Sequence, residues 1–255
     1  MVQTKTSKRV FIGGIAGGIG SSIAANLSSQ NWTVGGMGRP SKTWDAFREA
    51  HPDYQLHEAE GTDSGAVTAA VKAFAKENGG LDACIHAVGS VFLKPLHMIT
   101  DEEWTAYLDA NLSSAFYAAR AAIGPMRRQK SGVFLFFSSV ASEIGISNHE
   151  SVGAAKGGVT GLARSIAATY ASLGIRANVI APGLVDTPAA SMLTSSEQAL
   201  RISEKMHPLG RIGKPEELAS LASWLVSDEA SWMTGQVIPM DGGMGAIVPK
   251  PRVQG

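Results

Sequence analysis

The sequence has almost no cysteine and no excess of charge of either sign. Cys84 is its one cysteine, so no disulfide can form within the chain. Lysine plus arginine and aspartate plus glutamate number 22 each, a balance that gives no support for a nucleic-acid partner or an anionic membrane surface. No apolar run approaches the roughly 20 residues of a membrane-spanning helix. We therefore expect a protein of the reducing cytoplasm that works without nucleic acid or membrane.

Metal-ligand spacing is also lacking among the histidines, cysteines and acidic residues, so no metal site is predicted. What the chain does have is apolar material and glycine. Hydrophobic residues make up 44% of its 255 residues, enough for a sizeable core. Zero net charge leaves little repulsion to oppose self-association.

Short apolar segments alternate with longer segments of helical periodicity along the chain. The segments predicted as strands are 9–13, 33–37, 54–58, 83–87, 133–137, 175–180 and 236–240. The segments predicted as helices lie near 18–30, 42–50, 65–77, 101–128, 149–173, 196–206 and 215–227. Several of the predicted strands are apolar on both faces, which is typical of a parallel sheet covered on both sides.

This alternation predicts an α/β fold, a single doubly wound Rossmann domain with a seven-stranded parallel sheet flanked by helices. Because nothing interrupts the pattern, we assign residues 1–255 to one domain. Its cofactor half is expected over about 1–110, and its catalytic and substrate half over about 111–255.

A glycine-rich turn joins the first predicted strand to the first helix. Gly14, Gly18 and Gly20 stand in G-x-x-x-G-x-G spacing, with Ile19 between the last two. Glycines at such a junction permit a tight turn and let a pyrophosphate approach the N–H groups of the helix. The pattern alone is weak, but its position at the first strand–helix junction indicates a dinucleotide site.

The end of the second strand bears on the choice of dinucleotide. An acid is usual there in proteins that prefer NAD, but this sequence has Gly38 followed by Arg39. A guanidinium suits a 2′-phosphate, so we predict NADP(H); the alternative is a solvated loop arginine. Asp63, after the third strand, suits either the adenine amino group or the N-cap of the next helix.

Several ordered motifs carry a resemblance to a known family. Residues 13–20 read G-G-I-A-G-G-I-G, similar to T-G-x-x-x-G-I-G, and residues 86–89 read H-A-V-G where the family has N-N-A-G. Residues 176–183 read R-A-N-V-I-A-P-G and are similar to R-x-N-x-I-x-P-G. Nearly end to end, the sequence resembles the short-chain dehydrogenase/reductase family.

The resemblance implies an NADP(H)-dependent oxidoreductase acting on a small molecule. It implies that Ser139 polarises a substrate carbonyl, that Lys156 holds the nicotinamide ribose, and that Asn111 supports a water path to the lysine. Family members are usually dimers or tetramers, so we expect a homo-oligomer, with a homotetramer as the typical case. The residues predicted to bind the cofactor are Gly14, Gly18, Ile19, Gly20, Arg39, Asp63, Ala87, Gly89, Lys156, Pro182, Gly183, Val185 and Thr187.

One departure from the family pattern concerns its Y-x-x-x-K motif, which reads V-G-A-A-K over 152–156. Val152 has no proton to donate, and losing a general acid typically costs 10²–10⁴-fold in rate. His149 lies one helical turn earlier, and an ordinary imidazole with a pKa near 6.5 is a competent acid. His149 is therefore a candidate catalytic residue, although it suits equally well a histidine that merely begins the helix after an Asn148 cap.

Three functions follow from these residues. The first is an oxidoreductase acting on a carbonyl, an alcohol or a related activated double bond with an altered proton donor. The second is a nucleotide-binding homologue with a regulatory or structural role, and the third is non-redox chemistry in the same pocket. Retention of Ser139, Lys156 and Asn111 favours the first, whereas Val152 favours the others. Two further expectations are an apolar substrate lid over 192–206 and helix or C-terminal core positions for the tryptophans Trp104, Trp224 and Trp232.

Overall fold

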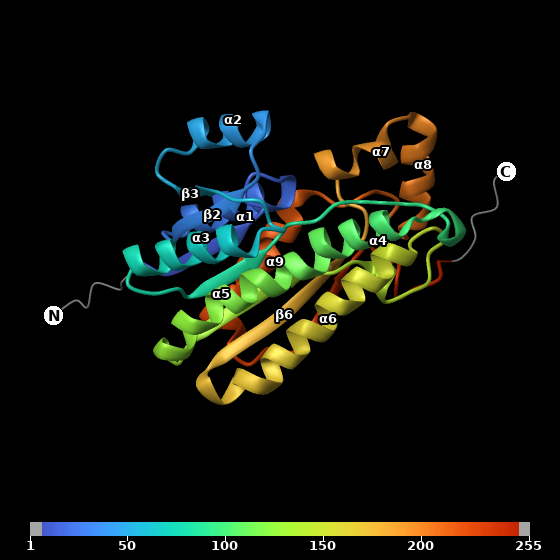
Figure 1. The fold of residues 1–255 in the computed structure, drawn as a ribbon. Helices are drawn as coiled ribbons and strands as arrows, with labels where there is room; N and C mark the ends of the chain where they lie inside the picture. Colours follow the sequence, from blue (N-terminus) through green and yellow to red (C-terminus); the bar gives the residue numbers. More distant parts are fainter. Residues whose placement is uncertain (1–6, 250–255) are drawn as a thin grey trace.

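A parallel sheet forms the centre of the computed structural model, which describes residues 7–249 (Figure 1). The strands are β1 Arg9–Gly13, β2 Thr33–Gly38, β3 Gln55–Glu58, β4 Ala83–His86, β5 Gly132–Phe137, β6 Ile175–Pro182 and β7 Val237–Met240. They lie in the order β3-β2-β1-β4-β5-β6-β7, and every pairing is parallel. The predicted seven-stranded α/β fold is confirmed. The strand order reverses between β1 and β4, and the crevice at that point is where such sheets bind ligands.

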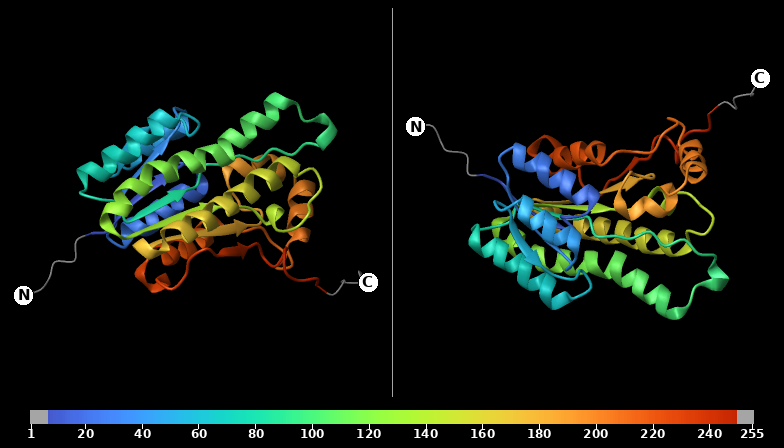
Figure 2. Two further views of the ribbon diagram at one scale, coloured as in Figure 1. Left: turned by 60° about the horizontal axis from the view of Figure 1, so that its bottom comes forward. Right: turned by 90° about the horizontal axis from the view of Figure 1, so that it is seen from above.

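Helices cover both faces of this sheet (Figure 2). The α-helices are α1 Gly18–Ser29, α2 Lys42–Ala50, α3 Ser64–Glu77, α4 Asp101–Leu108, α5 Ser114–Gln129, α6 Glu150–Tyr170, α7 Ser191–Thr194, α8 Glu197–Met206 and α9 Pro215–Val226. Short 3-10 turns cover Leu96–Met98, Val140–Ser142, Ala171–Leu173, Pro188–Ala190 and Asp228–Ala230. Side chains of α3, α5 and α6 pack on one face, and those of α1, α2 and α9 pack on the other.

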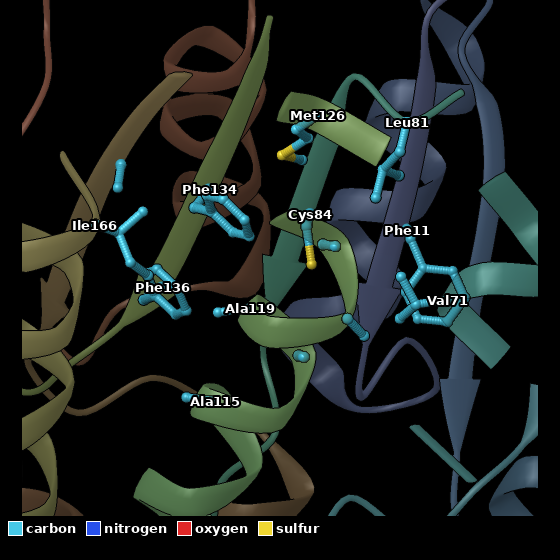
Figure 3. Packing of buried hydrophobic residues seen from close by; sticks show 14 of the residues in the cluster. Phe11, Val71, Leu81, Cys84, Ala115, Ala119, Met126, Phe134, Phe136 and Ile166 are labelled. Carbon is cyan, nitrogen blue, oxygen red and sulfur yellow. The ribbon is translucent and has the colours of Figure 1, made fainter. Parts of the chain in front are cut away.

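The core follows from alternation along the strands. Phe134 and Phe136 of β5 are two residues apart, so both rings point to the α5 face of the sheet, where Ala115 and Ala119 leave room for them (Figure 3). The two rings are stacked, with centroids 6.0 Å apart. Cys84 lies in the same cluster, where burial raises the pKa of its thiol to about 12.

The long helix predicted over 101–128 is divided into three parts. The capping box of Thr100 and Glu103 begins α4 as the sequence indicates. Residues Asp109–Ser113 then form a π-helical turn before α5 begins. A π-turn inserts one residue without changing which residues are apolar, so hydrophobic periodicity does not reveal it.

Two smaller expectations also change. Asn148 does not cap α6: it has a left-handed φ of 61°, and His149 occupies the cap position without a side-chain hydrogen bond. Trp232 is 99% exposed, so it is not a core residue. Trp224 has a helix position, on α9, and is 39% exposed.

Candidate active site

A cavity of about 500 Å³ opens at the carboxyl ends of the central strands. Gly18 and Ile19 line it from the turn after β1, Ala87 and Gly89 from the segment after β4, and Ser139 from the segment after β5. Pro182, Gly183, Val185 and Thr187 line it from the end of β6 onward. Eleven of the residues predicted for the site surround this one cavity: Gly18, Ile19, Ala87, Gly89, Ser139, His149, Lys156, Pro182, Gly183, Val185 and Thr187.

The glycine turn shows why glycine is needed where β1 meets β4. Gly14 has a φ of +77°, and a Cβ there would lie 2.9 Å from the carbonyl oxygen of Ala87. A Cβ at Gly18 would lie 2.9 Å from the Thr187 side chain. Gly14 and Gly20 stand behind the cavity wall, where they hold the turn, and α1 begins at Gly18 with its N-terminal N–H groups towards the cavity.

Besides Gly14 and Gly20, the predicted cofactor residues that do not line the cavity are Arg39 and Asp63. Arg39 is exposed in the loop that follows β2. The Asp63 carboxylate accepts hydrogen bonds from the backbone N–H groups of Gly65, at 2.8 Å, and Ala66, at 3.0 Å, and so caps α3. Of its two predicted roles, capping is the one visible in the fold.

Lys156 is a buried cation beside the cavity. It lies on α6 with 8% of its surface exposed, and its Nζ donates to the carbonyl oxygen of Phe137 at 3.3 Å. Burial lowers the pKa of this ammonium to about 8. The same ammonium, together with burial, lowers the pKa of the enclosed His86 to about 3, so His86 is neutral.

Asn111 lies within the π-turn and is fully buried. Its Oδ1 accepts from the Ser90 N–H at 3.1 Å, and its Nδ2 donates to the Tyr107 carbonyl oxygen at 3.0 Å. A Cβ placed on Gly89 would lie 3.2 Å from Lys156 Nζ and 3.3 Å from Asn111 Oδ1. The lysine and the asparagine therefore approach the same point of the backbone, and a side chain at 89 would separate them.

Val152 and His149 face the cavity from the first turn of α6. Val152 is buried against Tyr107, Ala141 and Ala155. His149 is half-buried, and its Nδ1 lies 2.8 Å from the Ser147 carbonyl oxygen. When Nδ1 carries the hydrogen of that contact, Nε2 is left as the ring's second functional nitrogen.

Sequence reasoning missed Tyr107 as a cavity residue, and His207 lines the cavity too. Tyr107 comes from α4, and nothing in the local pattern relates it to a motif 45 residues later. His207 is buried, with Nδ1 2.7 Å from the Ser203 carbonyl oxygen and Nε2 accepting from the Leu184 N–H at 3.0 Å. It joins the end of α8 to the loop that follows β6.

The expected lid corresponds to α7 and α8, which line one side of the cavity with apolar residues. These are Met192, Leu193, Ala199, Ile202 and Met206, and Ala190 of the preceding 3-10 turn lines the cavity beside them. Met192 is 75% exposed, so a large apolar surface faces the opening. Between residues 7 and 249 there is no cluster of metal-ligating side chains. In the same part of the chain, no helix combines the length and hydrophobicity needed to cross a bilayer.

Comparison with known proteins agrees with this geometry. Residues 14–245 match the family described as enoyl-(acyl carrier protein) reductase. The 3-oxoacyl-[acyl-carrier-protein] reductase MabA of Mycobacterium tuberculosis is 34% identical over 243 residues, which cover 94% of this chain and 93% of that protein. The cis-4-hydroxycyclohexanecarboxylate dehydrogenase of Sinomonas cyclohexanicum is 33% identical and covers 97% of this chain and 100% of its own.

Solved structures show the same fold. A gluconate 5-dehydrogenase from Burkholderia cenocepacia, in complex with NADP and tartrate, superposes with a TM-score of 0.87 at 26% identity, over 94% of this chain and 96% of its own. The sheet and the cavity at its switch point define a doubly wound α/β protein of Rossmann type. The chain belongs to the short-chain dehydrogenase/reductase family and is an oxidoreductase of that type.

The buried ammonium of Lys156 makes stability depend on pH. Unfolded lysine keeps its proton up to pH 10.5, whereas the folded residue loses it near pH 8, so the unfolded chain binds more protons in between. Wild-type stability should therefore rise from pH 8 to 10.5, by about 3 kcal/mol relative to Lys156→Met. Urea unfolding of both proteins at several pH values measures this difference.

The matched control is Lys72→Met, which removes an exposed lysine from α3. Its unfolding free energy should follow the wild type across the same pH range. Parallel curves for the wild type and Lys156→Met would contradict the assignment of Lys156 as a buried cation.

Proposed function

We propose that the protein is an NADP(H)-dependent oxidoreductase that interconverts a carbonyl compound and its alcohol, or reduces a related activated double bond, with an altered proton donor. The observation that carries the proposal is the convergence of the α1 N-terminus, Ser139 and Lys156 on one cavity at the switch point of the sheet. Polar groups with these chemistries are what a dinucleotide and a substrate oxygen require.

The residues present fit the dinucleotide. The α1 N-terminus suits the pyrophosphate, because the glycine turn leaves its N–H groups accessible. Lys156 has no carboxylate among its hydrogen-bond partners and suits the ribose hydroxyls, while Val185 and Thr187 suit the carboxamide. When bound, the nicotinamide supplies or accepts the hydride.

NADP(H) is proposed over NAD(H) on two grounds. Arg39 is exposed at the carboxyl end of β2, beside Gly38, where no acid stands to bind an adenine ribose. The solved gluconate 5-dehydrogenase relative was crystallised with NADP. An exposed guanidinium keeps all its donors available for a 2′-phosphate.

The proton is proposed to come from His149 in place of the tyrosine that the family pattern has at position 152. The Ser147 carbonyl oxygen accepts from Nδ1 and orients the ring, which leaves Nε2 to transfer the proton. Ser139 polarises the substrate oxygen, and the Asn111 amide supports Lys156 from the π-turn. In reduction, the carbonyl carbon gains the hydride and its oxygen gains the proton of His149.

Coenzyme preference is tested by Arg39→Asp. The substitution places a carboxylate against the 2′-phosphate and offers an acceptor to a 2′-hydroxyl, so the ratio of NADPH to NADH affinity should fall at least about tenfold. Calorimetric titration with both coenzymes measures the ratio. The control is Arg48→Asp, the same charge change at an exposed position of α2. An unchanged ratio in Arg39→Asp would remove Arg39 from the coenzyme site.

The proton donor is tested by His149→Ala, with ethyl acetoacetate and NADPH as substrates. We expect turnover to fall by about 10²–10³-fold, since a general acid is lost. Calorimetric NADPH affinity should stay the same. The control His97→Ala removes an exposed histidine from a 3-10 turn and should leave both quantities unchanged. Equal turnover of His149→Ala and wild type would exclude His149 as the donor.

A second function, nucleotide binding without turnover, is favoured by Val152 because its side chain offers no proton. Val152→Tyr separates the two functions in assays against a panel of carbonyl compounds. For an oxidoreductase with an otherwise complete site, we expect a gain in turnover of at least tenfold, within the range of an added general acid. Inactive wild type and inactive Val152→Tyr, both with tight NADPH binding, would favour the second function.

A further inference from the structure

The family motif has its tyrosine at position 152, on α6. In this chain a tyrosine on α4 lines the cavity instead. The chain has four tyrosines, and all four lie in the described part of the structure. Tyr107 of α4 is the one among them that lines the cavity. The site therefore contains a phenol although position 152 does not supply one.

Tyr107 and Val152 lie in the same part of the structure. Both belong to one small buried cluster with Ala141 and Ala155, and both line the cavity. Val152 stands on α6 one turn before Lys156, and Tyr107 enters the same cluster from α4. The two helices thus contribute a valine and a tyrosine to the same part of the cavity wall.

The Tyr107 hydroxyl is held in a closed set of hydrogen bonds. It donates to the Ser90 carbonyl oxygen at 3.0 Å, and the Ser90 N–H donates to Asn111 Oδ1 at 3.1 Å. Asn111 Nδ2 returns to the Tyr107 carbonyl oxygen at 3.0 Å. Ser90 itself lines the cavity beside Gly89, the residue that Lys156 Nζ approaches. The phenol is therefore held at Ser90, and Tyr107, Ser90 and Lys156 all line the same cavity.

We propose that Tyr107 is a substrate-contacting residue, whose hydroxyl holds the reacting oxygen of the substrate together with Ser139. The inference rests on the proposed oxidoreductase function. Burial raises the pKa of the Tyr107 hydroxyl, so it stays protonated and serves as a hydrogen-bond donor rather than as a base. A rotation of the O–H bond moves the donor from the Ser90 carbonyl to the substrate oxygen.

The chemistry assigned to Tyr107 is stabilisation, without transfer of its proton. In the reduction of a ketone, the hydride of NADPH adds to carbon, and the electron pair of the C–O π bond moves to oxygen. Two hydroxyl donors, from Ser139 and Tyr107, bind the developing oxyanion, and the proton from His149 completes the alcohol. NADPH is oxidised to NADP⁺, and both hydroxyls are unchanged at the end.

The experiment is Tyr107→Phe, which keeps the ring and removes the hydroxyl, in the NADPH-dependent reduction of ethyl acetoacetate. We expect kcat to fall by about 10²–10³-fold, the effect of losing one oxyanion donor, while KM and NADPH affinity change less than about twofold. The decrease should be the same at every pH from about 6 to 9, since Tyr107 does not titrate there. Tyr117→Phe, on a half-buried tyrosine of α5, is the matched control and should retain wild-type kcat.

A second readout does not depend on turnover. In protein labelled with 13C at tyrosine Cζ, Tyr107→Phe assigns one of the four tyrosine resonances. Titration with ethyl acetoacetate or cyclohexanone in the presence of NADP⁺ should shift that resonance and leave the Tyr117 resonance in place. A resonance that neither ketone shifts, or a Tyr107→Phe variant with wild-type kcat, would overturn the assignment of Tyr107.

The two readouts separate this inference from the proposed function. A shifted Tyr107 resonance in a protein that oxidises no NADPH supports the contact and rejects the oxidoreductase. Loss of turnover in His149→Ala, with normal turnover in Tyr107→Phe, supports the oxidoreductase and rejects the contact.

Discussion

The site depends on the close approach of two backbones, where the turn after β1 passes the end of β4. Gly14 lies against the Ala87 carbonyl at a distance that admits no Cβ. β1 and β4 pair in parallel over Val10–Gly13 and Ala83–His86, so any side chain at 14 would push these strands apart at their carboxyl ends. The α1 N-terminus and the Ala87–Gly89 segment border one cavity because this contact holds them together.

A second constraint is the buried ammonium of Lys156, which donates to the carbonyl oxygen of Phe137 and has no carboxylate partner among residues 7–249. Such a charge costs stability, and proteins keep uncompensated buried charges mainly at functional sites. Asn111 belongs to the same arrangement, because the π-turn inserts a residue at the place where its amide meets Ser90. The π-turn that carries Asn111 and the buried ammonium of Lys156 therefore both lie beside the cavity.

Much of the fold was predictable because its signals are local. Each of three signals occupies only a few consecutive residues: the glycine turn, the strands that are apolar on both faces, and the capping box at Thr100. The π-turn and the left-handed Asn148 were not, because neither changes the hydrophobic pattern. Trp232 was predicted in the core from its residue type, whereas the structure leaves it 99% exposed.

For the site, the sequence by itself determined the chemical groups: a hydroxyl at 139, an ammonium at 156, and an aliphatic residue at 152. Only the tertiary structure decided what accompanies them. Tyr107 meets Val152 across two helices, since packing brings together residues that are 45 positions apart. A sequence motif identifies residues within one helix, strand or turn. Which residues line a cavity depends on how separate helices and strands pack together.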